Sequence, residues 1–111
     1  MKLDKELVGA STSLLVLGVL ANEPSYGYQI VKRVNAAADG IFEWQEGTIY
    51  PILHKLEKEK LVRAQWQEAD TGRQRKYYYI TASGRDALAA QTERWKEFNG
   101  IVAQLVEAPH G

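Results

Sequence analysis

The sequence predicts a mainly α-helical protein with one small β-hairpin. Apolar residues recur at helical spacing in three segments before residue 61 and again in a long segment after residue 81. Between them the pattern alternates with a period of two, on either side of a polar turn that contains glycine. The chain has 111 residues and no cysteine, so we expect a single domain without disulfide bonds or thiolate metal sites.

Two helices are expected at the start of the chain, over residues 3–21 and residues 26–38. The first is apolar nearly all round from Leu14 onward, so it must be covered on more than one side. Either the core of the same chain or a partner chain could cover this helix, and both interpretations remain open. Ser25 stands where it would cap the second helix, after an interruption at residues 22–24.

The second helix leaves Gln29 and Lys32 available to the outside, and Asp39 and Gly40 end it. Residues 41–44 follow as a short apolar link, for which a small strand is one interpretation. This link leads directly into the next helical segment.

The third helix, expected over residues 46–60, has two different faces. Its apolar side consists of Ile49, Ile52, Leu53 and Leu56. Its other side carries Tyr50, Pro51, His54, Lys55 and Lys58. Taken alone, this pattern is typical of an ordinary amphipathic surface helix. Pro51 is tolerable if it lies within the first turn, before an intrahelical N–H is required.

A hairpin is expected over residues 61–80. Two strands, from residue 61 and over residues 74–80, flank a polar turn at residues 68–73. The tip then carries Arg73, Arg75 and Lys76. Three consecutive tyrosines at residues 77–79 favour extended structure, and hairpin packing is a simpler role for them than base stacking.

The last helix is expected from residue 82 to residue 106, with Thr81 as its cap, and residues 108–111 are expected to be a tail. Leu88, Trp95 and Val102 recur at heptad spacing, and Phe98, Ile101 and Leu105 lie alongside them. A helix of this length projects beyond one compact domain. Packing against a second copy of the chain and against the first helix would bury its apolar stripe, and burial within a single chain alone is the alternative.

Charge and composition limit the functions that fit this chain. The formal net charge is zero, but residues 50–80 carry seven Lys or Arg against four Asp or Glu, a local charge of +3. No signal peptide or membrane span is recognisable, so a soluble, cytoplasmic protein is expected. His54 and His110 lie far apart, and no nucleophile–base pair or phosphate-binding glycine loop is evident, so we expect no enzyme activity, metal or cofactor.

The order of elements predicts a winged helix-turn-helix with an added dimerisation helix. Residues 46–60 then occupy the position of the recognition helix, which enters the DNA major groove, and the hairpin is the wing. We expect residues 1–81 to form the DNA-binding part and residues 82–107 the dimerisation helix of the same compact domain. A double-stranded operator and a second copy of the chain are the expected partners.

Three stretches of the sequence resemble the PadR-like transcriptional regulators. They are LLVLGVLANEPSYGYQI in the first two helices, EGTIYPILHKLEKEKLV in the third helix and first wing strand, and TGRQRKYYYITASGRDAL from the wing into the last helix. The single C-terminal helix is similar to the small subfamily with that compact arrangement. The resemblance implies a homodimeric, sequence-specific repressor. In some small members, a tryptophan like Trp95 pairs across the dimer and sandwiches a flat aromatic compound.

These arguments give three sets of candidate residues. The expected DNA-binding residues are Gln29, Lys32, Thr48, Tyr50, Pro51, His54, Lys55, Gly72, Arg73, Arg75 and Lys76. The resemblance implies a ligand site that would comprise Leu7, Leu14, Leu88, Thr92, Trp95 and Asn99. The expected dimer interface comprises Leu88, Trp95, Phe98, Val102 and Leu105.

Two alternatives remain open at this stage. Trp95 fits a plain dimer-core residue as well as a ligand platform, because polar residues such as Thr92 and Asn99 surround it. A winged-helix module that binds a protein and no DNA is the second alternative, favoured by the zero net charge.

Overall fold

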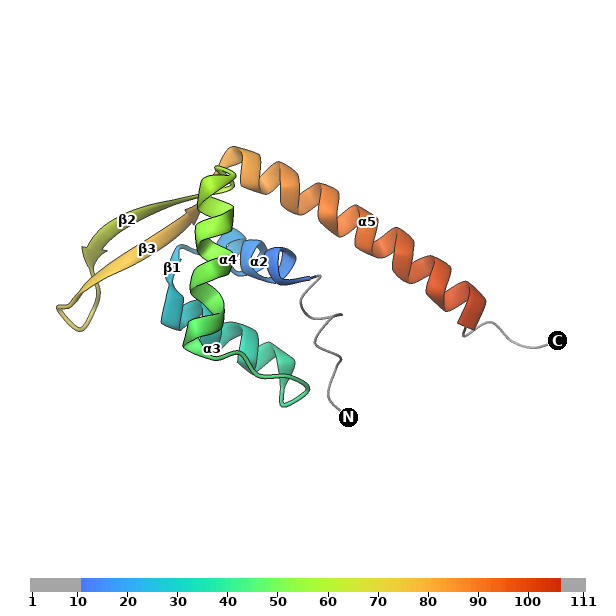
Figure 1. Ribbon diagram of the computed structural model, residues 1–111, viewed down its shortest axis with the longest axis horizontal. Helices are drawn as coiled ribbons and strands as arrows, with labels where there is room; N and C mark the ends of the chain where they lie inside the picture. The colour runs from blue at the N-terminus through green and yellow to red at the C-terminus, as the bar shows by residue number, and fades with distance from the viewer. Residues whose placement is uncertain (1–10, 107–111) are drawn as a thin grey trace.

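The computed structural model describes residues 11–106, and in this part of the chain helices outnumber strands (Figure 1). The elements in order are α2 (Thr12–Asn22), β1 (Ser25–Tyr26), α3 (Gly27–Ala38), α4 (Glu46–Lys58), β2 (Val62–Glu68), β3 (Gln74–Ile80) and α5 (Ala82–Val106). The mainly helical fold with a small sheet is therefore confirmed. Residues 3–10 of the expected first helix and the expected tail lie outside the described residues.

Helix α2 lies at the centre of the fold and contacts α3, α4, α5 and β3. Its side chains Val16, Leu17 and Leu20 are buried. They pack with Ile30 of α3 and Leu53 of α4 in one hydrophobic core. Surrounding elements thus cover several sides of the helix that the sequence predicted to be apolar nearly all round.

The expected hairpin is present, but it belongs to a sheet of three antiparallel strands in the order β1-β3-β2. Strand β1 pairs with β3, with Ser25 opposite Tyr78 and Tyr26 opposite Tyr77. Ser25 is therefore a strand residue, and its expected role as a helix cap was wrong. Helix α3 begins one residue after Tyr26, whose backbone N–H donates to Gln29 Oε1 over 3.3 Å.

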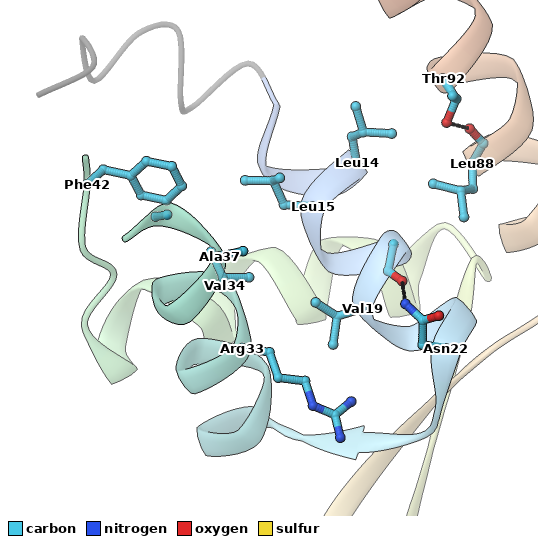
Figure 2. Close-up of a pocket in the computed structure, with 12 residues that line it drawn as sticks. Leu14, Leu15, Val19, Asn22, Arg33, Val34, Ala37, Phe42, Leu88 and Thr92 are labelled. Atoms are coloured by element: carbon cyan, nitrogen blue, oxygen red, sulfur yellow. Dashed lines mark hydrogen bonds between the residues drawn. The ribbon is translucent and has the colours of Figure 1, made fainter. Parts of the chain in front are cut away.

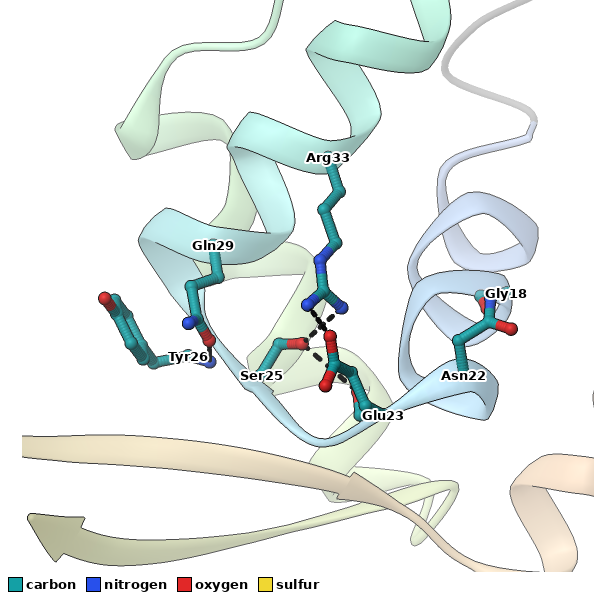
Figure 3. A network of polar contacts seen from close by, with 7 residues as sticks. All are labelled: Gly18, Asn22, Glu23, Ser25, Tyr26, Gln29 and Arg33. Carbon is teal, nitrogen blue, oxygen red and sulfur yellow. Dashed lines mark hydrogen bonds and ion pairs between the residues drawn. The ribbon is translucent and has the colours of Figure 1, made fainter. Parts of the chain in front are cut away.

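The buried Ser25 hydroxyl takes part in a small polar network (Figure 3). It donates to the Glu23 carbonyl oxygen and accepts from an Arg33 guanidinium nitrogen, both over 3.1 Å. Arg33 also forms an ion pair with the Glu23 carboxylate. These contacts attach the turn after α2 to the middle of α3, so they stabilise the angle between the two helices.

Residues 41–44 form a loop and not a strand. The Asn35 side chain takes the place of a strand partner here, because its Nδ2 donates to the Trp44 carbonyl over 2.9 Å and its Oδ1 accepts from the Trp44 N–H over 2.7 Å. The Trp44 side chain is buried in the core. The loop is thus anchored immediately before α4 begins.

Helix α4 starts at Glu46 as expected, and Pro51 lies in its second turn. The expectation that Pro51 falls within the first turn was wrong. Its nitrogen has no hydrogen to donate to the Gly47 carbonyl, and Gly47 is exposed, so water can satisfy that oxygen. The helix ends before Lys60, which has a left-handed φ of 63°.

Thr81 joins the end of α4 to the start of α5. Its hydroxyl accepts from the Gly84 N–H over 3.0 Å, which confirms the expected cap, and donates to the Lys60 carbonyl over 2.8 Å. Its backbone N–H donates to the Leu61 carbonyl over 3.1 Å. The direction of α5 relative to the rest of the fold is therefore held at this junction.

The wing and α5 project from opposite sides of the helical body, and the described chain measures 62 × 30 × 20 Å (Figure 1). None of the helices within residues 11–106 has the length and apolar character needed to cross a membrane.

Replacing Gly84 by Ala should destabilise the fold. The added methyl carbon would lie 2.1 Å from the Leu61 carbonyl oxygen and 2.7 Å from Ile80 Cγ1. The expected loss in the free energy of unfolding is about 1–3 kcal/mol, the usual cost of overpacking. Urea unfolding at a fixed protein concentration, followed by circular dichroism, measures this loss.

Gly100→Ala is the matched control in the same helix, because nothing lies within 4 Å of that position. It should stabilise the helix by about 1 kcal/mol through the higher helix propensity of alanine. Equal stability of the two variants would contradict the close contact at Gly84.

Candidate nucleic-acid interface

The outward face of α4 carries the polar side chains that the sequence placed there. Ile49, Leu53 and Leu56 are buried and fix the helix to the core. The exposed residues of the opposite face include Thr48, Tyr50, Pro51, His54 and Lys55. The structure therefore brings these five expected DNA-binding residues together on one accessible surface.

Tyr50 is held in place by its contact with the first turn of α3. A Cβ atom at Gly27 would lie 3.1 Å from the Tyr50 hydroxyl oxygen and 3.2 Å from two ring carbons. The absence of a side chain at Gly27 thus lets the phenol ring lie against α3. Tyr50 remains 45% exposed, so part of the ring is still accessible to a partner.

The turn of the wing is tight and carries Arg73. The Ala69 N–H donates to the Arg73 carbonyl and the Gly72 N–H donates to the Ala69 carbonyl, both over 2.8 Å. Gly72 has a φ of 85°, a conformation that glycine adopts without steric cost. The Arg73 side chain is exposed at this tip.

Arg75 and Lys76 lie on β3, nearer the body than the tip where the sequence placed them. The Arg75 guanidinium lies 4.9 Å from the centre of the Tyr26 ring, and its Nε is buried without a hydrogen-bond partner among the described residues. Lys76 Nζ lies 4.0 Å from Glu57 Oε1. Both cations are half-buried, and neighbouring side chains restrict them.

A groove of about 480 Å³, which we call the wing groove, lies between α4 and the wing. Its lining residues are Tyr26, Gly27, Tyr28, Glu46, Tyr50, His54, Trp66, Gln74, Arg75, Lys76 and Tyr78. Burial of Tyr78 raises the pKa of its hydroxyl above the ordinary value. The DNA-binding residues expected from the sequence did not include Tyr26, Tyr28, Trp66 or Gln74.

Gln29 and Lys32, the two expected DNA-binding residues of α3, differ in their accessibility. The Gln29 side chain is half-buried and its oxygen accepts from the start of its own helix. Lys32 is exposed, and its Nζ lies 5.4 Å from the centre of the Tyr28 ring. Lys32 is therefore the more accessible of the two.

A second groove, apolar and about 510 Å³ in volume, lies between α2, α3 and the base of α5 (Figure 2). We call it the helical groove, and Leu14, Val34 and Phe42 are among its lining residues. Leu88 and Thr92 of α5 lie along its other side.

The residues of the expected ligand site are divided between the helical groove and a smaller hollow beside Trp95. Leu14, Leu88 and Thr92 line the helical groove, whereas Leu14 and Trp95 line the hollow, which has a volume of about 340 Å³. Asn99 lies one turn beyond Trp95 and lines neither. Leu7 is outside the described residues. Leu14 is thus the residue that these two spaces share.

One side of the far half of α5 is apolar and uncovered. Trp95 is 51% exposed, and Phe98, Val102 and Leu105 are exposed beyond it. Leu88, near the base of the helix, packs partly against the core. The expected dimer interface therefore starts at the core and continues outward along α5.

No cluster of His, Asp or Glu that could hold a metal ion occurs within residues 11–106.

Comparison with known proteins identifies the family. Residues 16–90 match the model of the transcriptional regulator PadR-like family. The chain belongs to this family. It is a PadR-like transcriptional regulator, and the matched residues extend from the second turn of α2 through the wing into α5.

Solved structures of other PadR-like proteins share the fold. A PadR-like transcriptional regulator from Bacillus cereus strain ATCC 14579 superposes with a TM-score of 0.85 at 28% identity, over 95% of this chain and 100% of that chain. A PadR family regulator from Eggerthella lenta is 32% identical with a TM-score of 0.77, over 94% of this chain and 88% of that chain.

A longer relative is the transcriptional regulator YqjI of Escherichia coli strain K12. It is 26% identical over 94 residues, which cover 85% of this chain and 40% of that protein. This PadR-like chain therefore matches less than half of the length of that relative.

Proposed function

We propose that this regulator is a homodimeric repressor that binds a specific double-stranded operator. The observation that carries the proposal is the joint position of Tyr50 and His54 on α4 beside Arg75 and Lys76 of the wing, all four lining the wing groove. Polar side chains near the start of a recognition helix reach base edges in the major groove, and cations on a wing reach phosphates. Residues 1–81 would serve this function, in the cytoplasm, and residues 82–107 would serve dimerisation.

The charge distribution supports DNA binding by a chain that is neutral overall. The net charge of zero gives no general attraction to nucleic acid. The local excess of cations lies in the stretch that contains α4 and the wing, and Arg73 extends it to the tip. Binding would therefore depend on this face alone.

Dimerisation through α5 is supported by the exposed apolar stripe. Leu88 and Val102 stand seven positions before and after Trp95. If two α5 helices crossed antiparallel at Trp95 about a twofold axis, the partner's Val102 would face Leu88. The far end of the partner's helix would then enter the helical groove, which is lined by Leu88 and closed by α2 and α3.

Release of the operator by a flat aromatic compound is a further part of the proposal. The hollow beside Trp95 is bordered by Leu14, Gln91 and Arg94, and two such hollows would meet in an antiparallel dimer. Facing indoles offer stacking surfaces to a planar ligand. A ligand that binds one arrangement of the dimer more tightly than another would change the affinity for DNA.

The competing function is a winged-helix module that binds a protein and no DNA. The zero net charge is the observation that favours it. Failure to select any DNA sequence from a random pool would support this alternative over the repressor.

Charge and base-contact variants should affect operator binding differently. After an operator has been selected from a random duplex pool, Arg73→Gln should weaken binding to all sequences and reduce the salt slope by about 1, because it removes one phosphate contact. His54→Ala should instead change which sequences are selected, with about 1–3 kcal/mol lost at the contacted base pair. Fluorescence anisotropy at several salt concentrations measures both.

Arg85→Gln is the matched control for Arg73→Gln, because it removes the same charge from an exposed position on α5. It should leave operator affinity close to that of the parent. Parental binding by both Arg73→Gln and His54→Ala would rule out the proposed interface.

A charge in the apolar stripe of α5 should dissociate the dimer. Phe98 is 64% exposed in the single chain, so Phe98→Asp should leave the fold intact. It would bury an unpaired carboxylate in the dimer and weaken association by about tenfold or more. Sedimentation equilibrium measures this loss, and Lys96→Glu, at an exposed position two residues away, is the control. A dimer unaffected by Phe98→Asp would place the interface elsewhere.

Trp95 should report ligand binding by its fluorescence. In a variant with Trp44→Phe and Trp66→Phe, Trp95 is the remaining tryptophan of the three. A planar cationic aromatic compound that stacks on it should quench its emission and weaken operator binding in the same concentration range. If a panel of such compounds causes no quenching, Trp95 serves packing alone.

A further inference from the structure

Trp66 does not belong to the hydrophobic core that residues 11–106 form. It lies on β2 and is 65% exposed, far from the apolar stripe of α5. Tyr28 and Tyr50 are also exposed, and all three aromatic side chains line the wing groove. The wing groove therefore contains a concentration of uncovered aromatic surface.

The strand register explains why Trp66 faces this groove. Val62, Ala64 and Trp66 alternate along β2 and share one face of the sheet. Val62 is buried in the core, whereas Trp66, four residues further along, is beyond it. Lys76 is opposite Trp66 on β3, so an ammonium group and an indole stand side by side on the same face.

The cations of the wing groove are positioned but incompletely neutralised. Arg75 projects to the face of β3 opposite to Lys76, where it stacks against Tyr26 and has a buried Nε without a partner among the described residues. Lys76 Nζ lies 4.0 Å from the Glu57 carboxylate and 5.7 Å from the centre of the Tyr78 ring. The contact with Glu57 is at the limit of an ion pair, so an anion in the groove could compete for Lys76.

Aromatic faces next to cations match the chemistry of a sugar–phosphate chain. Cationic side chains bind phosphate oxygens, and aromatic rings pack on the flat or apolar parts of a nucleotide. A purely apolar ligand would remove water from the Lys76 ammonium group without replacing it, which is costly. A nucleotide unit is therefore the ligand that can bind both the aromatic and the cationic side chains of the wing groove.

The position of the wing groove determines which nucleotide unit can reach it. Tyr50 and His54 on its α4 wall belong to the face proposed to enter the major groove. The backbone strand that borders a major groove occupied by α4 must pass between α4 and the wing. We propose, resting on the proposed operator binding, that the wing groove seats one sugar–phosphate unit of duplex DNA, with Trp66 packed on the deoxyribose and Lys76 on the phosphate.

The test compares variants that remove aromatic surface with variants that change charge. Trp66→Ala should weaken binding to the selected operator about tenfold without changing the salt slope, because it removes packing and no charge. Lys76→Gln should lower the salt slope by about 1. Trp66→Phe, which retains a ring, should recover most of the affinity lost in Trp66→Ala.

A third variant should act in the opposite direction. Glu57→Gln removes the carboxylate that competes for Lys76, so it should tighten operator binding by about twofold to fivefold. Ile41→Ala is the control for loss of exposed apolar surface, since Ile41 is 45% exposed and does not line the wing groove. Thermal unfolding of each variant shows that the fold is retained.

The possible failures are distinguishable. If the parent protein selects no DNA, both the proposed function and the seat in the wing groove are wrong. If the parent binds its operator and Trp66→Ala binds it within twofold of the parent, only the seat is wrong. A preference for single strands over duplex DNA that disappears in Trp66→Ala would overturn the assignment to duplex DNA.

Discussion

The junction at Thr81 is the constraint on which the arrangement of this regulator depends. The Thr81 hydroxyl bonds to the Lys60 carbonyl and the Gly84 N–H, and its N–H bonds to the Leu61 carbonyl. One residue therefore joins the end of α4, the start of the wing and the first turn of α5. Because Gly84 has no side chain, α5 approaches this point too closely to pivot without breaking the contact. The proposed DNA surface and the proposed dimer surface are consequently parts of one rigid unit.

Tyrosine rings organise much of the basic surface. Arg75 lies over Tyr26, Lys76 over Tyr78 and Lys32 over Tyr28. Arg63 lies 4.2 Å from the centre of the Tyr79 ring, and the Tyr79 hydroxyl donates to Gln67 over 2.6 Å. Long cationic side chains lose rotamer entropy when they bind, and a ring that already restricts them reduces that loss. A chain without net positive charge can in this way present an effective basic face.

Sequence periodicity predicted the long elements because each has enough residues to repeat its pattern. The bounds of α4, β3 and α5 agree with expectation to within about two residues, the usual uncertainty of helix and strand ends. Strand β1 could not be predicted in this way, since two residues carry no period and the pairing of Ser25 with Tyr78 depends on a distant strand. Alternation along β2 places Trp66 on the face of Val62, but it does not reveal where along the strand the core ends. The roles of the candidate site residues remain predictions.

The loop before α4 connects the helical groove to α4. Phe42 lines that groove, and its ring lies 6.3 Å from the ring of Trp44, which Asn35 holds at the start of α4. A partner helix or a small molecule that fills the groove would contact Phe42, which belongs to the loop that leads into α4. If this loop couples the groove to the proposed operator binding at α4, each site must change the affinity of the other by the same factor.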